Sequence, residues 1–311
     1  MRASVIVPAY NCARLLPATL EAIAAQDVAP HEVIVVDDGS TDGTAEAARS
    51  SAVEVTVIEG DHAGPAVARN RGVARASGEA LAFTDADCVP QRSWLREGLR
   101  ALEHADLVQG AVLPDPAVAI GPFDRVVSVG ADSALYETAN LLVRRELFDA
   151  IGGFEDPLGA RLGKPLGEDV LFGWRARRRG ARVTFDREAV VHHAVFQRGA
   201  LAYIAERGRL VYFPALAAKL PELRRERLFA RGFQTRRSAA FDLALAGAAV
   251  SLVSGSPLPS MAALPYAAAV VRRARAWPAR APLVAAVDLA ADAVGFAALA
   301  LGSARSRSPV L

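Results

Sequence analysis

The sequence predicts an α/β fold, in which a mostly parallel sheet is flanked by helices and followed by an apolar, α-helical C-terminal extension. Through the first half of the chain, short apolar runs alternate with segments of helical periodicity. The runs are continuously apolar, as in strands buried on both faces. With 311 residues, 52% of them hydrophobic, the chain is long enough to bury a large core. From about residue 199 the composition changes to Arg clusters and Ala-rich tracts.

The first strands and helices follow from periodicity and turn residues. Ser4–Val7 is a β-branched run closed by Pro8-Ala9-Tyr10-Asn11, which predicts a strand followed by a loop. The predicted elements that follow are a helix over Arg14–Gln26, a strand over Glu32–Val36, a helix capped by Ser40 or Thr41 and running to Arg49, a strand over Val53–Ile58, and a helix over Ala66–Ala76 closed by Gly78.

Two carboxylates follow the next apolar run. Ala80–Phe83 leads through Thr84 into Asp85-Ala86-Asp87. Side chains at i and i+2 of a strand share a face, so both aspartates are predicted to reach one site at the strand exit. Such a pair suits a divalent cation that also holds phosphate oxygens. The alternative is an ordinary solvated turn, in which Asp-x-Asp is common.

Polar residues follow the other strands in the same way. Tyr10-Asn11 follows the first strand and Asp37-Asp38 the second, so they are predicted to meet the Asp85–Asp87 segment at the carboxyl edge of the sheet. There, a carboxylate could bind a nucleobase or ribose, Tyr10 could lie against a base, and Arg69 could pair with a diphosphate. The sequence has neither a G-x-G-x-x-G segment after a strand nor a G-x-x-x-x-G-K-[ST] loop.

Four motifs in this order resemble those of the family 2 glycosyltransferases, which have the GT-A fold. They are Val5-Ile6-Val7-Pro8-Ala9-Tyr10-Asn11, Val35-Val36-Asp37-Asp38-Gly39-Ser40-Thr41-Asp42, Ala68-Arg69-Asn70-Arg71-Gly72 and Thr84-Asp85-Ala86-Asp87. The resemblance covers roughly residues 1–220, the predicted catalytic domain. It implies a nucleotide-diphosphate-sugar donor held by Pro8, Ala9, Tyr10 and Asp38, with Arg69 near its diphosphate. It also implies a divalent metal, Mn²⁺ or Mg²⁺, with Asp87 as its main ligand and Asp85 contacting the donor or the metal.

The middle of the chain adds a second acidic pair. Thr138–Val143 is predicted to be a strand, Arg145–Ile151 a helix, and the Gly-rich Gly159–Gly167 a mobile loop. Glu168-Asp169 then opens a helix that ends before Gly180, where the two carboxylates could simply complement the helix dipole. The resemblance implies instead that Asp169 is the general base, with Glu168 the next candidate. An acceptor hydroxyl must lose its proton as it attacks, and a carboxylate can accept it.

The histidines and cysteines add one more candidate. His31, His62 and His104 are predicted to be solvated, while His192-His193 follow the strand Ala189–Val191. The resemblance implies a metal or phosphate ligand at His193, although the adjacent His192 leaves the register open. Cys12 and Cys88 are too few for a disulfide framework, which fits a reducing, cytoplasmic setting. No secretory signal is expected before Val5.

Residues 221–311 are predicted to be a separate, membrane-associated helical region that follows a helix over Ala200–Leu220. Gly255–Pro259 splits the apolar tract Ala239–Val271 into pieces that we expect to be too short to span a bilayer. The tract Ala281–Gly302 is long enough but contains Asp288 and Asp292. Arg clusters and a Trp flank both tracts, which favours a re-entrant hairpin or interfacial helices at the cytoplasmic face of the cell membrane. Packing on the catalytic domain, or a dimer seam, is the alternative.

The predicted activity is metal-dependent, inverting sugar transfer from a nucleotide-diphosphate sugar to an acceptor hydroxyl of a lipid, glycan or small molecule. Synthesis of a cell-envelope glycan, a glycolipid or a glycosylated metabolite would each fit. A sugar nucleotidyltransferase is an alternative, but it would need a Gly-rich phosphate loop where Pro8-Ala9-Tyr10-Asn11 stands. A non-catalytic, membrane-bound nucleotide-sugar-binding module is another. The net charge of +2 gives no indication of nucleic-acid binding.

Overall fold

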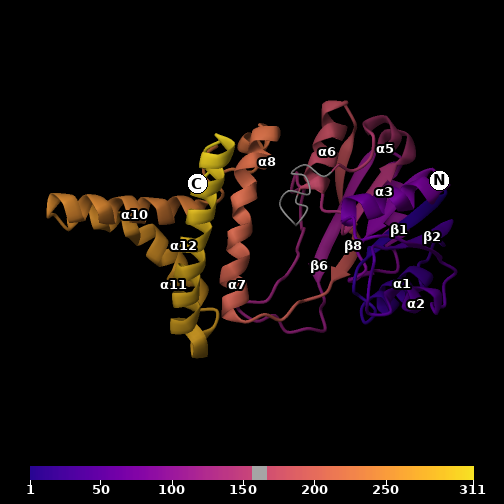
Figure 1. Ribbon diagram of the computed structural model, residues 1–311, viewed down its shortest axis with the longest axis horizontal. Coiled ribbons are helices and arrows are strands. Elements are labelled where there is room, and N and C mark those ends of the chain that lie inside the picture. The colour runs from indigo at the N-terminus through magenta and orange to yellow at the C-terminus, as the bar shows by residue number, and fades with distance from the viewer. Residues whose placement is uncertain (156–166) are drawn as a thin grey trace. The chain divides into compact units, whose positions relative to one another are not determined.

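The computed structural model describes residues 1–155 and 167–311 (Figure 1). The chain forms two compact units, which we call the sheet unit and the helical unit. The sheet unit comprises Met1–Ala119 and Val126–Val195, and the helical unit comprises Ile120–Arg125 and Phe196–Leu311. This division falls after Val195, upstream of the domain boundary predicted at residue 220. Except for Gly167, the predicted Gly159–Gly167 loop lies outside the described residues.

The sheet unit contains a mixed sheet with the strand order β3-β2-β1-β4-β7-β6-β8-β5. The strands are β1 (Ala3–Ala9), β2 (Glu32–Asp37), β3 (Thr56–Glu59), β4 (Ala80–Thr84), β5 (Cys88–Pro90), β6 (Leu107–Pro114), β7 (Asn140–Arg144) and β8 (Val183–His193). The first four strands in this order, β3, β2, β1 and β4, are parallel, as predicted. The other half is not, because β7 is antiparallel to both β4 and β6. The connection from β6 to β7 begins and ends at the same edge of the sheet. Because it does not cross back to the opposite edge, β7 runs antiparallel to β6.

Helices cover this sheet, and most lie where periodicity predicts them (Figure 1). They are α1 (Leu16–Ala24), α2 (Thr44–Arg49), α3 (Pro65–Arg75), α4 (Trp94–Leu102), α5 (Arg145–Ile151) and α6 (Glu168–Arg178). The predicted inner face of α1 is confirmed, since Leu16, Leu20 and Ile23 are fully buried. On α3, a side chain at Gly72 would come within 2.6 Å of Ile6, so glycine is what lets α3 approach β1 closely.

Some predicted boundaries were wrong. Strand β3 begins at Thr56 and not at Val53, and β8 extends through His193 and does not end at Val191. Helix α2 begins at Thr44, with Gly43 at the N-cap, so neither Ser40 nor Thr41 caps it. Asp42 provides the cap-like contact instead, because its Oδ1 accepts a hydrogen bond from the Thr44 amide at 3.1 Å. Ser40 and Thr41 are engaged elsewhere, as described below.

A buried polar network ties the antiparallel half of the sheet to α4. Asn140, at the start of β7, is fully buried and accepts a 2.8 Å hydrogen bond from Trp94 Nε1. Its amide donates to the carbonyls of Ala111 in β6 and Ala189 in β8, at 2.8 and 2.7 Å. These carbonyls flank the register shift between β6 and β8. The network therefore fixes the strand that ends at His193.

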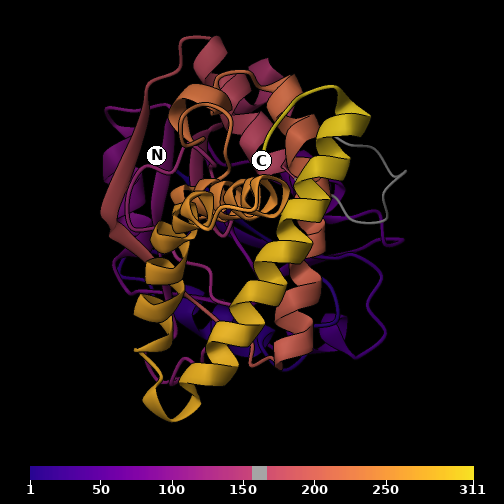
Figure 2. The ribbon, with the colours of Figure 1, turned by 90° about the vertical axis from the view of Figure 1, so that its left-hand side faces the viewer.

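The helical unit is built around its last helix. Its elements are α7 (Ala200–Glu206), η2 (Arg207–Tyr212), α8 (Phe213–Lys219), α9 (Leu223–Glu226), α10 (Arg236–Ser254), η3 (Leu258–Ala263), α11 (Leu264–Ala274), η4 (Pro278–Arg280) and α12 (Ala281–Ser306). The predicted Ala200–Leu220 helix is interrupted by the 3₁₀ segment η2. Helix α12 lies alongside α7, η2 and α8 (Figure 2).

Helix α10 is longer than predicted, because it starts at a capping box formed by Thr235 and Ser238. It reaches 19 residues, so the expectation that this tract is too short to span a bilayer was wrong. By length and composition, Arg236–Ser254 and Pro278–Ser306 could each cross a membrane, and only 11% and 39% of their apolar windows are buried. The two acids of α12 are paired within the unit: Asp288 with Arg273 and Arg237, and Asp292 with Arg237.

Candidate active site

The loops after β1 and β2 are tied together at the carboxyl edge of the sheet. The Asn11 amide donates to Ser40 Oγ, and Asn11 Oδ1 accepts from the Thr41 amide, both at 2.9 Å. A third bond runs from the Ala13 amide to Asp42 Oδ2 at 3.1 Å. The Ser-Thr-Asp part of the second motif therefore has a structural role. It holds in place the loop that presents Tyr10, whose side chain is 47% exposed.

Asp38 anchors a second loop at the same edge. Its carboxylate is buried and accepts 2.8 and 2.7 Å hydrogen bonds from the amides of Ala63 and Gly64. Gly39 adopts a positive φ of 81°, and a side chain there would come within 3.0 Å of the His62 amide. Only glycine meets both demands without strain, so Gly39 permits this loop to close on β2.

The anchored loop places His62 on Tyr10. The two ring centroids are 4.1 Å apart with 30° between the planes, and His62 Nδ1 lies 3.8 Å from Asp38 Oδ2. The expectation that His62 is merely solvated was incomplete, since it is exposed but stacked. No sequence pattern indicated the pair, because Tyr10 and His62 come from different strands' loops.

Asp85 and Asp87 lie in a tight turn after β4, in which the Cys88 amide donates to the Asp85 carbonyl at 3.1 Å. The turn, and not the strand pleat, decides where each carboxylate goes. Asp85 contacts Arg69, and Asp87 faces His193. Both aspartates are partly exposed, at 29% and 22% of the side chain. The two acids therefore reach the same edge but have different partners.

Arg69 joins the first aspartate to the second acidic pair. Its Nη2 lies 2.8 Å from Asp85 Oδ1, and its Nη1 lies 3.5 Å from Glu168 Oε1. The guanidinium is buried and also lies 5.8 Å from the centre of the Phe154 ring. A planar guanidinium can bridge two carboxylates in this way, whereas a lysine would offer a single point charge. Arg69 thus contacts Glu168, which lies 99 residues away in the sequence.

Asn70, which follows Arg69 in the sequence, binds the backbone of Phe154. Asn70 Nδ2 donates to the Phe154 carbonyl at 2.8 Å, and Asn70 Oδ1 accepts from the Phe154 amide at 2.9 Å. The Phe154 ring stacks on Phe172 of α6 at 4.4 Å. Asn70 therefore fixes the turn after α5, while the ring contact fixes α6 and its N-terminal acids.

Glu168 and Asp169 form the first turn of α6, where their charges complement the helix dipole. Glu168 is buried against Arg69, whereas Asp169 retains some exposure as a residue although its carboxyl group is enclosed. The pKa of Asp169 is raised well above its usual value, mainly because the carboxylate is desolvated and next because of the nearby charge of Glu168. The neighbours thus differ in a way that their sequence does not show: one is ion-paired, and the other has the raised proton affinity that suits a base.

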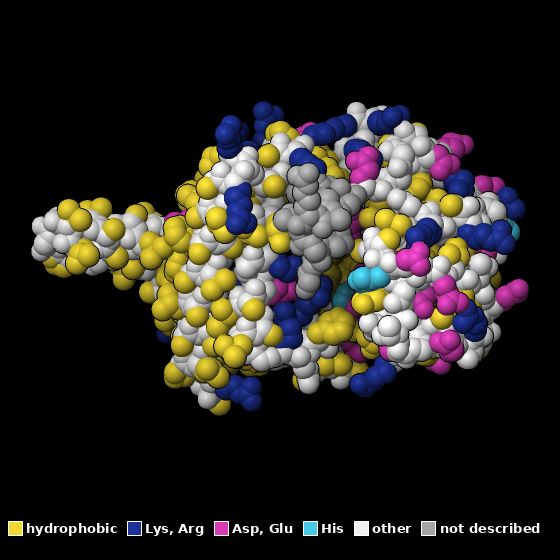
Figure 3. Space-filling view, viewed as in Figure 1, with side chains coloured by type: hydrophobic (Ala, Val, Ile, Leu, Met, Phe, Trp, Pro, Cys, Tyr) yellow, Lys and Arg dark blue, Asp and Glu magenta, His cyan; other side chains and the backbone are white. Residues whose placement is uncertain are grey.

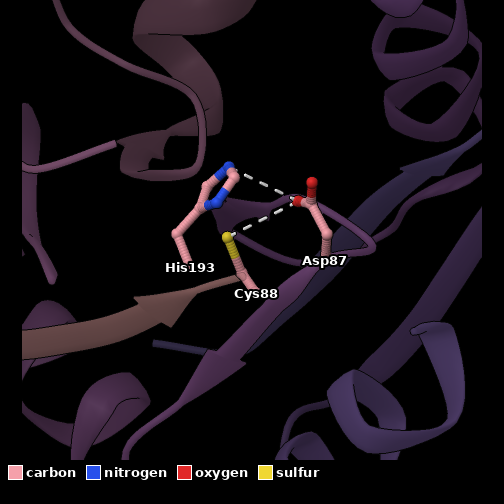
Figure 4. Close-up of side chains that lie close together, drawn as sticks. All are labelled: Asp87, Cys88 and His193. Carbon is pink, nitrogen blue, oxygen red and sulfur yellow. Dashed lines mark hydrogen bonds and ion pairs between the residues drawn. The ribbon is translucent and has the colours of Figure 1, made fainter. Parts of the chain in front are cut away.

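His193 ends β8, where it lies opposite Cys88 of β5 (Figure 4). Its Nδ1 lies 2.9 Å from the Ala194 carbonyl, which can only accept, so Nδ1 is the donor in this bond and Nε2 is the nitrogen that faces the site. Nε2 lies 3.6 Å from Asp87 Oδ1. Of the two histidines, His193 lies in the cluster with Asp87 and Cys88. Carboxylate and imidazole donors at this spacing fit a divalent cation.

Comparison with known proteins now gives the family. The sequence profile of "Glycosyl transferase family 2" matches residues 4–118, which include Tyr10, Asp38, Arg69, Asp85 and Asp87. The chain belongs to family 2 of the glycosyltransferases. It is 32% identical over 206 residues to the glycosyltransferase AglE of Haloferax volcanii, an alignment that covers 61% of this chain and 66% of AglE. The chain spans only 25% to 66% of the length of the first curated relatives that it matches.

Solved glycosyltransferase structures have the same fold. The mannosyltransferase PcManGT of Pyrobaculum calidifontis, in complex with GDP-Man and Mn²⁺, superposes with a TM-score of 0.58 at 24% identity, covering 97% of this chain and 86% of that one. TarS 1–349 of S. aureus, in complex with UDP-GlcNAc, gives a TM-score of 0.53 at 19% identity, covering 99% and 93%. These likenesses identify the GT-A fold. Glu168, Asp169 and His193 lie outside the segment matched by the family 2 profile, so their assignment depends on the contacts described above.

Proposed function

We propose that this chain transfers a sugar from a nucleotide-diphosphate sugar to an acceptor hydroxyl, with a divalent metal as cofactor. The observation that carries the proposal is the Arg69 bridge, which joins Asp85 of the Thr84–Asp87 motif to Glu168, the neighbour of Asp169. A donor-binding edge and a candidate base are thereby held in one cluster. The nucleotide-sugar complexes of PcManGT and TarS support the donor class.

Each end of the donor has candidate partners. The stacked Tyr10 and His62 offer an exposed aromatic surface for the nucleobase, and Pro8, Ala9 and Asp38 lie beside it. Arg69 is the cation nearest to Asp85 and would face the diphosphate. Asp87 and His193 would hold the metal, with Asp85 as a further oxygen donor. A bound divalent cation supplies positive charge that stabilises the departing diphosphate.

Asp169 would act as the base. The acceptor hydroxyl attacks the anomeric carbon, its proton passes to Asp169, and the bond to the nucleotide diphosphate breaks. This is one displacement, so the configuration at the anomeric carbon is inverted. A carboxylate with a raised pKa accepts a proton more readily near neutral pH than an ordinary aspartate does.

The helical unit would hold the enzyme at the cytoplasmic face of a membrane. Between Asp242 and Arg272 the sequence has no Asp, Glu, Lys or Arg, and this stretch forms the outer part of α10, η3 and the start of α11. Its apolar side chains are exposed, with Leu252 at 87%, Val253 at 89% and Leu258 at 71%. Figure 3 shows no charged side chain on the projecting end of α10 on this face. A protein surface in water rarely exposes so large an apolar segment, whereas a lipid phase would cover it.

Arginines lie where this apolar segment joins the rest of the helical unit, at the start of α10 and the end of α11. Arg236, Arg272 and Arg275 are exposed there, and Arg237 and Arg273 are paired with the acids of α12. Exposed arginines beside an apolar segment are attracted to anionic lipid headgroups. The helix of 19 residues is about 28 Å long, close to the thickness of a hydrocarbon core. An acceptor carried by a lipid would fit this location, and a glycan or a small molecule would also be compatible.

A donor screen tests the proposed activity. Thermal unfolding of the full chain is measured with UDP-, GDP- and dTDP-sugars, each with and without Mn²⁺ or Mg²⁺, followed by a search for donor turnover. A donor at 100 times its Kd stabilises the folded state by about 2.7 kcal/mol, which gives a clear shift in Tm. If no nucleotide sugar shifts Tm in the presence of either metal, the proposal is wrong. If a donor binds but neither transfer nor hydrolysis occurs, the binding-module alternative is favoured.

A further inference from the structure

A sulfur atom lies beside the two metal-ligand candidates. The Sγ of Cys88 is 4.0 Å from Asp87 Oδ1, and His193 Nε2 is 3.6 Å from the same oxygen (Figure 4). One potential ligand atom from each of the three residues lies within 4.8 Å of the others. The site therefore contains one oxygen, one nitrogen and one sulfur donor.

The backbone holds the three residues in place. Cys88 and His193 are directly opposite each other in the antiparallel pair β5–β8, so their side chains leave the sheet on the same face. Asp87 precedes Cys88, and its carbonyl accepts a 2.9 Å hydrogen bond from the Ala194 amide, which follows His193. Residues on both sides of the cluster are thus tied across the two strands.

We propose that Asp87, Cys88 and His193 form a binding site for a thiophilic divalent cation of the zinc class, with a fourth position open to water or ligand. Tetrahedral coordination at ordinary Zn–O, Zn–N and Zn–S lengths places ligand atoms about 3.3–3.6 Å apart. The two separations that include Asp87 Oδ1, 3.6 and 4.0 Å, need to shorten by less than about 1 Å. The third separation, from sulfur to the imidazole nitrogen, is at most 4.8 Å and needs to shorten by up to about 1.5 Å, so the side chains must close on the cation as it binds. Binding would release the thiol proton to solvent as the metal–sulfur bond forms.

The sulfur changes which cations the site prefers. Mg²⁺ selects oxygen ligands, whereas mixed sulfur and nitrogen ligands favour Zn²⁺, Co²⁺ and Cd²⁺. The metal that we propose for sugar transfer uses the same Asp87 and His193. The two kinds of cation therefore compete, and a thiophilic cation would displace Mg²⁺ or Mn²⁺ from the donor site. This inference extends the metal site of the proposed function, but its test needs no nucleotide.

The test is a titration of the purified full chain with Co²⁺, without donor. A thiolate ligand gives Co²⁺ an intense charge-transfer absorption in the near ultraviolet, which oxygen and nitrogen ligands do not give. The wild type should show this band. Cys88→Ser should lose it and should bind Zn²⁺ at least about tenfold more weakly, while Mn²⁺ affinity, measured by the loss of its free-ion paramagnetic signal, changes less than about threefold.

The chain provides a matched control, because Cys12 is the only other cysteine. Cys12→Ser should keep the band and the Zn²⁺ affinity. Absence of the band in the wild type, its persistence in Cys88→Ser, or its loss in Cys12→Ser would each overturn the proposal. If Cys88→Ser does not fold, ¹¹³Cd NMR of the wild type decides, because the chemical shift separates sulfur from oxygen ligation. Failure of the donor screen would leave this result unaffected, so the two proposals can fail separately.

Discussion

Nη2 of Arg69 lies 2.8 Å from Oδ1 of Asp85, and the same guanidinium reaches Glu168 through Nη1 at 3.5 Å. Arg69 comes from a helix, Asp85 from the turn after β4, and Glu168 from the start of α6. Each carboxylate near this buried cation is partly neutralised, which keeps the acidic groups at the sheet edge from repelling one another.

Replacing Arg69 should uncouple the two acidic segments. In Arg69→Met, Glu168 loses its partner while buried, so the free energy of unfolding should fall by about 2–3 kcal/mol, less than for a fully buried pair because Asp85 is partly solvated. Arg69→Lys keeps the positive charge but loses the planar guanidinium that contacts both carboxylates. It should therefore be more stable than Arg69→Met, yet its kcat/KM should be about 10- to 100-fold lower than that of the wild type. Urea denaturation and initial rates measure both effects. Arg75→Lys, on the exposed face of the same helix, should be neutral, and a stable Arg69→Met would contradict a bridging role.

Asp169→Asn should separate chemistry from donor binding. The amide keeps the size of the side chain but cannot take the acceptor's proton at neutral pH. Turnover should fall by about two to four orders of magnitude, while donor affinity changes by less than about tenfold. Single-turnover rates and donor titrations give the two numbers. Glu168→Gln is the comparison: if it abolishes transfer while Asp169→Asn remains near-native, the base is Glu168.

The raised pKa of Asp169 predicts a pH dependence of stability with a definite sign. The folded state retains this proton above pH 3.8, the usual pKa, where the unfolded chain releases it. The contribution is fully present below that pH and is lost as pH rises through the raised pKa. Asp169→Asn lacks the ionisable group, so its stability relative to wild type should increase with pH over this window. Denaturation of both proteins at a series of pH values checks this, and a constant difference would show that the pKa is not raised.

The same ionisation should shape the turnover profile. A base must be deprotonated, so kcat of the wild type should rise with pH as Asp169 loses its proton in the substrate complex. The acidic limb should therefore lie above the range of an ordinary aspartate. It should vanish from the residual activity of Asp169→Asn. An unchanged limb in the variant would assign the ionisation to another group.

Asp87→Ala should abolish metal-dependent donor binding. The proposed cation loses its carboxylate ligand, and the diphosphate loses its main counter-charge. The donor-induced rise in Tm and the turnover should both disappear, whereas the folded state should persist because Asp87 is partly exposed. Asp149→Ala, an exposed acid of α5, should leave both unchanged. Normal donor stabilisation of Asp87→Ala in the presence of metal would remove Asp87 from the metal site.

Charges placed at the end of α10 and the start of η3 should release the protein from membranes. The full chain should sediment with vesicles that contain anionic lipid and should be partly released by salt. Leu252→Asp with Leu258→Asp would put carboxylates into the hydrocarbon, so vesicle binding should fall by at least about tenfold. Val28→Asp, at an exposed position of the sheet unit, is the control for a change of charge alone. Soluble behaviour of the wild type, without vesicle binding, would favour the packing or dimer alternative.

Sequence patterns were sufficient to predict most of the N-terminal strands and helices and the edge of the sheet at which the site lies. Strands buried on both faces must be apolar throughout, and parallel strands present their following loops at one edge, so Tyr10, Asp38 and Asp85 could be assigned to that edge before any contact was known. Local chemistry also marked the start of α6, because acidic side chains complement a helix N-terminus.

The partners of the site residues became known only from the three-dimensional fold. The pairing of Arg69 with Glu168, the stacking of His62 on Tyr10, and the approach of Cys88 to His193 each join segments far apart in the chain. The antiparallel course of β7 and the register of His193 depend on the buried Asn140 network, which has no periodic signature. Periodicity reports which face of an element is buried, whereas a partner across the fold is chosen by packing and by the need to satisfy buried polar groups.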